Sequence, residues 1–309
     1  MNTPVALIIF KRAKTTERVF EAIRQAKPSR LFVIADGART DRPVEAEKCE
    51  KTRAIIEKVD WDCEVLKHYS DINRGVKWNV VDGLNWVFDN VDEAIILEDD
   101  CLPHPTFFRY CEELLNYYRN DKRIMTISGN NFQFGKQRTE YSYYFSRYPN
   151  TWGWATWKRA WQSFDIEMKL WEKIRDNNYL KLILEEPELA SYWNYVFQCA
   201  YDDKITAWDY QWILTSWINN GLCIIPNVNL VSNIGYGEEA TNTKDVISPY
   251  SNIPLREMHF PMLHSPFVFR HAGADKFIQT THYYQTNSFL RTVDKAKKIL
   301  AQMQSLIST

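Results

Sequence analysis

Three consecutive acidic residues, Glu98, Asp99 and Asp100, follow an apolar run at positions 94–97. An apolar run without alternation is typical of a strand covered on both faces of a parallel sheet, and Pro103 then ends the strand. The carboxyl ends of strands in open α/β sheets line the ligand crevice, so we expect the carboxylates to face a site. Hard oxygen ligands suit Mg²⁺ or Mn²⁺, which commonly bind one or two carboxylates together with phosphate oxygens. A solvated acidic turn is the alternative interpretation.

The tryptophans are concentrated in one part of the chain, because nine of the 12 lie between positions 152 and 217. Each aromatic ring buries roughly 150–250 Å², so core packing explains most such clusters, and a ligand platform is the alternative. The irregular aromatic stretch at 141–161 is the segment that we expect to form a loop facing a substrate. The nine are Trp152, Trp154, Trp157, Trp161, Trp171, Trp193, Trp208, Trp212 and Trp217.

The first hundred residues alternate between apolar runs and helical periodicity. Strands are predicted at 5–10, 31–35, 63–67 and 94–97, and the helices between them begin near Thr15, Pro43 and Gly75. This order predicts an α/β fold, in which a mostly parallel sheet is flanked by helices and joined by right-handed crossovers. The second strand ends at Asp36, which adds another carboxylate to the same edge.

The rest of the chain is predicted to contain more helix than strand. Helices are predicted at 107–118, 168–184, 189–201, 207–219 and 292–307, and strands at 125–128 and 222–225. Beyond Pro226 the pattern weakens into loops rich in Gly, Asn and Pro. We therefore expect one domain at 1–237, with halves at 1–103 and 104–237, and a less regular C-terminal extension at 238–309 that packs on the same domain.

Composition excludes several classes of function. Lys and Arg number 38 against 39 Asp and Glu, and there is no basic block, so nucleic acid and anionic membrane surfaces are not expected partners. The apolar run at 5–10 is too short for a signal-peptide core or a membrane span. Six cysteines without a CxxC pair fit a reducing compartment, without disulfides or zinc. We expect a soluble, cytoplasmic protein.

The ordered set of motifs resembles the GT-A glycosyltransferases, specifically the branch that includes Golgi N-acetylglucosaminyltransferase I and its bacterial relatives, such as the family 2-like enzymes. The resemblance covers roughly positions 4–237 and does not extend into the tail. Unlike the Golgi enzymes, the sequence shows no N-terminal membrane anchor. The motifs that carry the resemblance are the acidic run 95–100 with Pro103 and Phe107-Phe108, the W-D-x-x-W-type segment 208–212, the strand 223–226, and the opening 8–12.

This resemblance implies a Rossmann-like GT-A fold and a metal-dependent, inverting glycosyltransferase of the hexosyl- or N-acetylhexosaminyltransferase class. Its donor would be a nucleotide sugar, with a UDP-sugar favoured, and its acceptor a glycan or another hydroxyl compound. Asp100 would bind Mn²⁺ (or Mg²⁺) that bridges the donor diphosphate. Glu98 and Asp99 would support the ribose or metal-bound water. The half at 1–103 would bind the donor and the half at 104–237 the acceptor.

Further residues at the N-terminal half are implied as donor contacts. Phe10 and Arg12 end the first strand, which resembles the family's nucleotide-binding strand, and Asp36 resembles the acid that contacts the base. Arg74 and Lys77 are the other candidate cations, because a departing nucleoside diphosphate develops negative charge that Arg or Lys stabilises. Solvated surface charges and, for Asp36, a turn-forming residue are the alternatives.

Asp209 matches the family's base-bearing segment and is our choice for the base that accepts the proton of the acceptor hydroxyl. Flanking Trp208 and Trp212 would exclude water and stack on a sugar, and partial desolvation would raise the pKa of Asp209 toward a useful value. A helix cap is the alternative role. Trp152 and Trp154 complete the expected acceptor-binding residues.

Several acids and one histidine are substitutes. The acids that would replace Asp209 as the base if it does not serve are Asp202, Asp203, Glu238 and Glu239. His271 is a candidate second metal ligand. Two other readings compete with glycosyl transfer. A nucleotidyltransferase would use a similar sheet, but it normally has a Gly-rich loop after the first strand, which 10–14 lacks. A non-catalytic glycan-binding protein would bind sugar through the Trp-rich region without metal or nucleotide.

Overall fold

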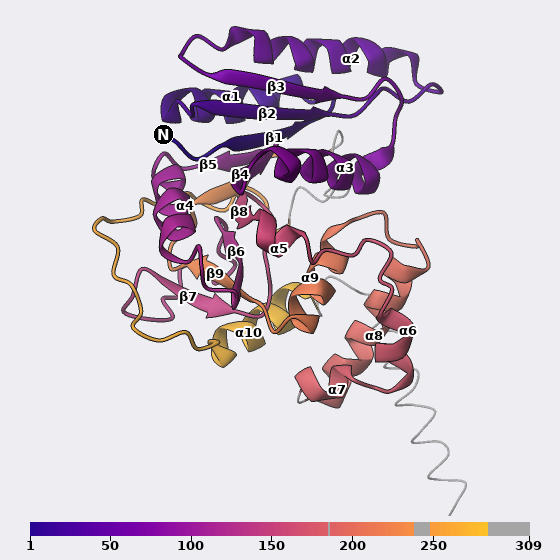
Figure 1. The fold of residues 1–309 in the computed structure, drawn as a ribbon, viewed down its shortest axis with the longest axis vertical. Coiled ribbons are helices and arrows are strands. Elements are labelled where there is room, and N and C mark those ends of the chain that lie inside the picture. The colour runs from indigo at the N-terminus through magenta and orange to yellow at the C-terminus, as the bar shows by residue number, and fades with distance from the viewer. Residues whose placement is uncertain (185, 238–247, 284–309) are drawn as a thin grey trace, which may run out of the picture.

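The structure is a computed structural model of the 309-residue chain and describes residues 1–184, 186–237 and 248–283. An eight-stranded sheet with the order β3-β2-β1-β4-β8-β6-β9-β7 forms its centre (Figure 1). Its strands are β1 (Val5–Ile9), β2 (Arg30–Ala35), β3 (Glu64–Tyr69), β4 (Glu93–Glu98), β6 (Ile124–Ser128), β7 (Tyr143–Ser146), β8 (Trp154–Trp157) and β9 (Leu222–Pro226). Outside this sheet, β5 (Cys101–Pro103) pairs antiparallel with β10 (Val231–Asn233).

The first four strands of the large sheet are parallel and alternate with helices. Every residue of β1 is buried because helices cover both faces. Val5, Leu7 and Ile9 pack with α1 and α4 on one face, whereas Ala6 and Ile8 pack with α3 on the other. The helices are α1 (Ala13–Ala26), α2 (Pro43–Arg53), α3 (Gly75–Asn90) and α4 (Thr106–Tyr117), with a short 3₁₀ turn at Ala54–Lys58. The predicted α/β, Rossmann-like fold is therefore confirmed.

Strand β8 departs from the sequence-based expectation of an irregular loop. It lies between β4 and β6 and runs antiparallel to both. All four of its residues are buried, with Trp154 packed in the cluster on one face of the sheet and Trp157 in the cluster on the other. A segment that buries both faces forms a central strand, so the aromatic residues here build the sheet.

A group of helices follows β8 and lies to one side of the sheet (Figure 1). The helices are α5 (Lys158–Trp161), α6 (Trp171–Asp176), α7 (Leu180–Ile183), α8 (Pro187–Tyr201) and α9 (Asp209–Ile218). The apolar cluster that α6, α7, α8 and α9 share contains Trp171, Trp193 and Trp217, whereas α5 packs with α3 in a cluster on one face of the sheet. The single helix predicted at 168–184 is wrong, because Asn178 has a φ of 54°, in the left-handed region that cannot continue an α-helix.

The described part of the C-terminal extension packs on the same core. Met258 and Met262 belong to the main cluster of the sheet, and Ile253 and Ile278 belong to the helical cluster. Its regular elements are α10 (Ala272–Ile278) and a π-helical turn at Gln279–Tyr283. The helix predicted at 292–307 lies outside the described residues.

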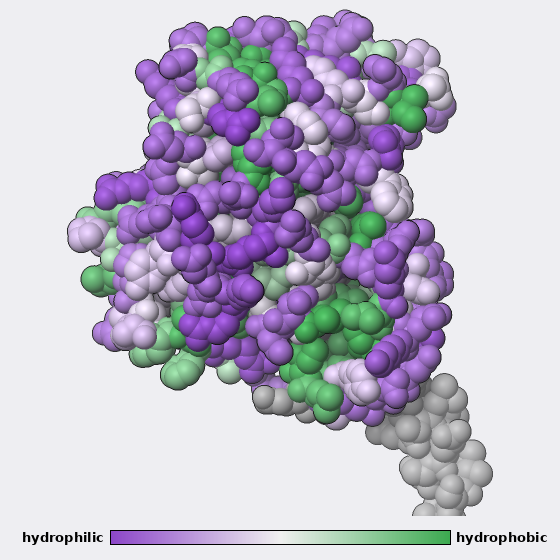
Figure 2. All heavy atoms as spheres, viewed as in Figure 1, coloured by the Kyte–Doolittle hydropathy of each residue, from purple (hydrophilic) through white to green (hydrophobic). Residues whose placement is uncertain are grey.

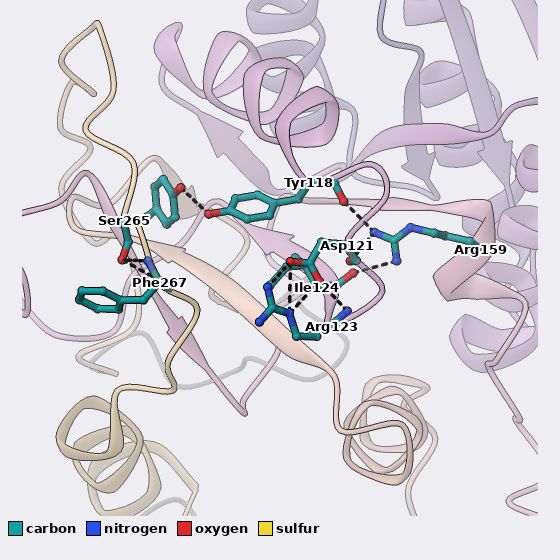
Figure 3. A network of polar contacts seen from close by, with 8 residues as sticks. Tyr118, Asp121, Arg123, Ile124, Arg159, Ser265 and Phe267 are labelled. Carbon is teal, nitrogen blue, oxygen red and sulfur yellow. Dashed lines mark hydrogen bonds and ion pairs between the residues drawn. The ribbon is translucent and has the colours of Figure 1, made fainter.

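Arg159 on α5 joins the connection between α4 and β6 (Figure 3). Its guanidinium donates to four backbone carbonyl oxygens, those of Arg119 at 2.8 Å, Ile124 at 3.0 Å, and Tyr118 and Asp121 at 3.1 Å. One side chain thereby links four carbonyl acceptors of the turn, and two of them, those of Tyr118 and Asp121, also accept from the backbone N–H groups of Asp121 and Ile124. The start of β6 is held against α5 in this way, and β6 leads directly into the site described below.

The visible face of the molecule is mostly polar, and an apolar area lies in its lower half beside α8 (Figure 2). Exposed apolar side chains of the helical group include Leu182 on α7 and Tyr195 on α8. In the part of the chain that the structure describes, no helix combines the length and the apolar character that crossing a bilayer requires.

Candidate active site

A pocket of about 620 Å³ lies at the carboxyl edge of the sheet. Its walls include the residues that follow β1, β2 and β4, the start of α3, the segments 149–152 and 205–210, and Asn130, Phe132, Asn233, His282 and Tyr283. The strand order reverses between β1 and β4, which is where ligands bind in doubly wound sheets. The volume is in the range of small-molecule sites, roughly 300–1,000 Å³.

Arg12 is the cation at the centre of the acidic cluster. One guanidinium nitrogen lies 2.8 Å from Oδ2 of Asp100, and a second donates to Asp99. The backbone N–H of Phe10 donates to Asp99 at 3.4 Å. Burial lowers the pKa of Arg12, but the charges of Asp99 and Asp100 raise it by more, so the guanidinium stays charged. The ends of β1 and β4 are therefore joined by ion pairs inside the pocket.

The three acids carry more negative charge than Arg12 balances. Burial raises the pKa of Glu98, and the neighbouring Asp100 raises it further. Glu98 and Asp100 offer oxygen ligands of the type that Mg²⁺ and Mn²⁺ prefer, so this donor set fits a divalent cation. Among the described residues no three His, Cys, Asp or Glu side chains are arranged to hold a metal, so oxygens of a bound phosphate would have to complete the coordination.

Asp36 lines the pocket, but its carboxylate is fully occupied by the protein. Oδ1 accepts from the backbone N–H groups of Gly37 at 2.9 Å and Arg74 at 2.8 Å. Oδ2 accepts from Gly75 N–H and from Asn73 Nδ2, both at 3.0 Å. Because these four donors engage both oxygens, Asp36 orders the start of α3. Its contact with a nucleotide base stays a prediction.

The structure does not bring Arg74 and Lys77 into the pocket, which corrects their prediction as donor-binding cations. A guanidinium nitrogen of Arg74 lies 2.6 Å from Oδ2 of Asp82, which lies farther along α3. The ammonium of Lys77 pairs with Asp203 in the turn after α8. Each side chain is directed by a neighbouring carboxylate that sequence spacing alone does not reveal.

Phe10 lines the pocket between two further cations. Lys11 Nζ lies 5.4 Å and the Arg39 guanidinium 5.9 Å from the centre of its ring. Both cations also bind Glu45, with Lys11 at 2.7 Å. The Glu45 carboxylate has a lowered pKa because Arg39 donates hydrogen bonds to it. An aromatic ring beside cations is suited to a stacked base and its phosphates.

Asp209 lies on the wall of the pocket formed by the second half of the chain. It is the first residue of α9, and its Oδ1 accepts from the N–H of Tyr210 at 3.1 Å. Burial raises the pKa of Asp209. No cation pairs with this carboxylate among the described residues, so it is chemically distinct from the Arg12-bound cluster. The alternative role of a helix-terminal residue is compatible with this position.

Only two of the four tryptophans predicted to bind an acceptor line the pocket. Trp152 and Trp208 do so, although Trp208 is only 4% exposed. Trp154 and Trp212 are 1% and 0% exposed and lie in the apolar cluster between α3 and the sheet. This corrects their predicted role, because side chains buried in the core cannot contact a ligand.

The substitute residues lie elsewhere. His271 begins α10, where its Nδ1 accepts from Ala274 N–H at 3.1 Å and its Nε2 lies 3.0 Å from the Arg138 carbonyl oxygen, so both ring nitrogens are engaged away from the pocket. Asp202 and Asp203 pair with lysines and do not line the pocket. Glu238 and Glu239 lie outside the described residues.

Sequence reasoning missed His282, Asn130 and Asn150, all of which line the pocket. Burial lowers the pKa of His282 to about 4, so the imidazole is neutral at physiological pH. Its ring lies 4.7 Å from that of Phe132. The acids were located because polar residues just beyond a strand lie at the carboxyl edge of the sheet. The same rule applies to Asn130, which follows β6.

No protein-family model matches this chain, and no curated protein matches it. Solved structures with a similar arrangement include residues 1–349 of TarS from S. aureus, with a TM-score of 0.42 and 9% identity over 75% of this chain and 60% of that one. A cytidylyltransferase from Leptospira borgpetersenii has a TM-score of 0.33 and 14% identity over 53% and 64% of the two chains.

A putative nucleotide-diphospho-sugar transferase from Desulfovibrio desulfuricans has a TM-score of 0.31 and 12% identity over 53% of this chain and 68% of that one. Because the identities and TM-scores are low, the function is inferred below from the residues that line the pocket.

Proposed function

We propose that this protein is an inverting, metal-dependent glycosyltransferase of the hexosyl- or N-acetylhexosaminyltransferase class. It moves a sugar from a nucleotide sugar, with a UDP-sugar favoured, to a hydroxyl of a glycan or another acceptor. The observation that carries this proposal is the presence in one pocket of an acidic cluster after β4 and a separate carboxylate, Asp209, at the start of α9.

The first half of the chain supplies the groups for the donor. Phe10, Lys11 and Arg39 offer a ring and cations beside the end of β1. Arg12 is held by Asp99 and Asp100, so its position is fixed before a ligand binds. A divalent cation bound by Asp100 and Glu98 would neutralise the diphosphate as it departs. Fixed positive charge beside the leaving group stabilises the transition state without reorganisation.

The second half supplies the base. Asp209 accepts the proton of the acceptor hydroxyl while the hydroxyl oxygen forms a bond to the anomeric carbon of the sugar. The bond between that carbon and the diphosphate oxygen breaks, and the nucleoside diphosphate leaves with the electron pair. Attack from the face opposite the leaving group inverts the anomeric configuration. The raised pKa of Asp209 brings its basicity closer to that of an effective general base.

Nucleotidyl transfer is the second candidate, and the three cations Lys11, Arg12 and Arg39 on the pocket wall favour it. A nucleoside triphosphate carries more negative charge than a diphosphate sugar, so a basic wall suits it. Two of these cations are already paired with Glu45 and the third with Asp99 and Asp100, which weakens that argument.

A thermal-shift screen of the purified chain distinguishes these functions. UDP, GDP, CDP, dTDP, their sugars and the corresponding triphosphates are tested with Mn²⁺ and with a chelator. A ligand at 100 times its Kd stabilises the folded state by about 2.7 kcal/mol, which a melting curve detects readily. A Mn²⁺-dependent shift with a diphosphate sugar supports glycosyl transfer, and a preference for a triphosphate supports nucleotidyl transfer. A folded sample that responds to no nucleotide contradicts both and favours glycan binding alone.

The role of the acidic cluster is tested by Asp100→Ala, which removes a carboxylate from the proposed cation site. We expect Mn²⁺-dependent nucleotide binding, measured by calorimetry, to be lost. Glu113→Ala is the matched control, because Glu113 on α4 pairs with His264 and does not line the pocket. Unchanged Mn²⁺ dependence in Asp100→Ala would remove the cluster from its assigned role.

A further inference from the structure

Two buried asparagine side chains line the pocket without using their amide groups. Asn130 is 0% exposed, and in the described part of the chain neither its Oδ1 nor its Nδ2 has a hydrogen-bond partner. Asn150 is 5% exposed, and its Nδ2 likewise has no partner there. A buried polar group left unpaired costs about 1–3 kcal/mol, and such groups are rare in native proteins. Their place in a pocket points to a ligand.

The backbone around both asparagines is held firmly at the end of β6. The hydroxyl of Ser128 donates to the carbonyl oxygen of Asn150 and accepts from the N–H of Asn150 at 3.1 Å. Gly129 N–H donates to the carbonyl oxygen of Gly153 at 2.7 Å, immediately before Asn130. A Cβ on Gly129 would lie 2.5 Å from atoms of neighbouring side chains, so the backbone there is tightly enclosed. The backbone that carries both side chains is therefore fixed, whereas Oδ1 and Nδ2 of Asn130 and Nδ2 of Asn150 are unpaired within the described residues.

The amides lie farther along the same sheet edge as the acids. Strand β6 runs in the same direction as β4, because β8 between them is antiparallel to both. Neighbouring strands are roughly 4.8 Å apart, which puts the end of β6 roughly 10 Å from the end of β4. If the diphosphate lies at the acidic cluster, as the proposed function requires, the group beyond the diphosphate lies toward Asn130 and Asn150.

The chemistry of the amides selects the ligand group. They present two N–H₂ donors and one carbonyl acceptor without charge, and a phosphate would instead need cations or several N–H donors. Adjacent sugar hydroxyls match this set, because one hydroxyl donates to Oδ1 of Asn130 while its neighbour accepts from Nδ2. A site built to pair a hydroxyl discriminates strongly against ligands that lack it.

We propose that Asn130 and Asn150 bind adjacent free hydroxyls of the hexose that is transferred, and so determine which donor sugars are accepted. This inference rests on the proposed function. Its test compares Kd values by calorimetry, with Mn²⁺ present, for UDP, UDP-glucose and UDP-galactose, and for GDP and GDP-mannose. Two or three hydrogen bonds of about 0.5–1.5 kcal/mol each make the best hexose conjugate bind about tenfold more tightly than its free diphosphate.

Asn130→Leu and Asn150→Leu should each abolish most of this tenfold preference while leaving the Kd of the free diphosphate unchanged. Asn90→Leu is the control, because Asn90 is exposed on α3 and bonds only to the Trp86 carbonyl within the described residues. A preference that persists in both pocket variants overturns the proposal. A loss of affinity for the free diphosphate itself would place the ribose at the amides and would also overturn it.

Two further measurements separate this inference from the proposed function. If the wild type binds no nucleotide, melting curves with free glucose, galactose and mannose test the hydroxyl site directly. A rise in melting temperature that is lost in Asn130→Leu supports the hydroxyl site. No rise with any of the three sugars overturns the proposal. Without ligand, Asn130→Leu should melt at the wild-type temperature or above, because an unpaired amide is removed. A large fall in the melting temperature of Asn130→Leu, together with an unchanged preference for hexose conjugates, would establish a structural role for Asn130 instead.

Discussion

Asp209 is set apart from the other acids of the pocket by its contacts, since Arg12 pairs with Asp99 and Asp100 but not with Asp209. Asp209→Asn keeps the shape of the side chain and removes its basicity. We expect the affinity for a nucleotide sugar to be retained and transfer to fall by about 10²-fold or more, as is typical of a missing general base. Calorimetry and steady-state kinetics measure the two quantities.

The control for this variant is Asp202→Asn, because Asp202 pairs with Lys204 on the surface and does not line the pocket. It should transfer sugar at the wild-type rate. Near-normal turnover in Asp209→Asn would exclude Asp209 as the base and leave Glu238 and Glu239 as the candidates that the sequence offers.

The raised pKa of Asp209 also predicts a dependence of stability on pH. A carboxyl group whose folded-state pKa lies above its ordinary value destabilises the folded protein when it is charged. This cost is complete above the folded-state pKa and disappears as pH falls through that value toward the ordinary carboxyl pKa. Asp209→Asn should therefore raise the melting temperature near neutral pH and have no effect in acid. An equal change in melting temperature near neutral pH and in acid would argue against the burial of the Asp209 charge.

The loop between β3 and α3 depends on the Asp36 carboxylate, which accepts four hydrogen bonds from residues 37 and 73–75. Asp36→Asn replaces one acceptor oxygen with an N–H₂ group that faces donors. We expect a loss of about 1–3 kcal/mol in the free energy of unfolding, measured in urea. Asp62→Asn, at an exposed position before β3, should change the free energy of unfolding by less than about 0.5 kcal/mol. Equal effects would contradict the assigned role of Asp36.

The connection that leads into β6 depends on Arg159, whose guanidinium holds four carbonyl oxygens of the turn after α4. Arg159→Met keeps much of the apolar stem and leaves these acceptors without the donor. Hydrogen bonds to charged groups contribute about 1.5–3 kcal/mol, so we expect a loss of at least that size in the free energy of unfolding.

Arg119→Ala is the matched control for Arg159, because its side chain is 54% exposed and pairs with Glu93 on the surface. Exposed pairs contribute about 0–1 kcal/mol, so this variant should be close to the wild type. If Arg159→Met were equally mild, the turn before β6 would have to be held by other contacts.

Over the molecule as a whole, the described part of the C-terminal extension, residues 248–283, packs into the apolar clusters of the fold. Six of its described residues are buried in the apolar clusters: Tyr250, Ile253, Met258, Met262, Ile278 and Tyr283. Each large apolar side chain contributes about 1.5–3 kcal/mol by burial, and a typical domain is stable by only about 5–15 kcal/mol. A chain that ends at residue 237 should therefore not unfold cooperatively, as measured by near-ultraviolet circular dichroism and thermal melting.

A single cavity in the same region is the graded control for this truncation. Met258→Ala should lower the free energy of unfolding by about 2–5 kcal/mol, and this variant should still unfold in one transition. A truncated chain that melted as cooperatively as the full-length protein would show that residues 1–237 are sufficient for the fold.

Local pattern was sufficient to predict the N-terminal half of the sheet. Uninterrupted apolar runs such as 5–10 and 94–97 form parallel strands because both of their faces are buried, and such strands place their final residues at one edge. This is why Arg12, Glu98 and Asp100 could be assigned to a common site. The motif 208–212 likewise located Asp209, because a motif lies within one element and does not depend on distant partners.

Tertiary contacts decided what local pattern could not. Trp152 and Trp154 are two residues apart, yet one lines the pocket and the other is in the core, because β8 begins at Trp154 and enters the sheet beside β4. Arg74 and Lys77 were assigned by charge alone, but Arg74 pairs with Asp82 farther along α3 and Lys77 pairs with Asp203 after α8. Asn130 and His282 are brought together by strand order and by the return of the C-terminal segment. Pairings between distant segments depend on the whole packed core, which no local window of the sequence contains.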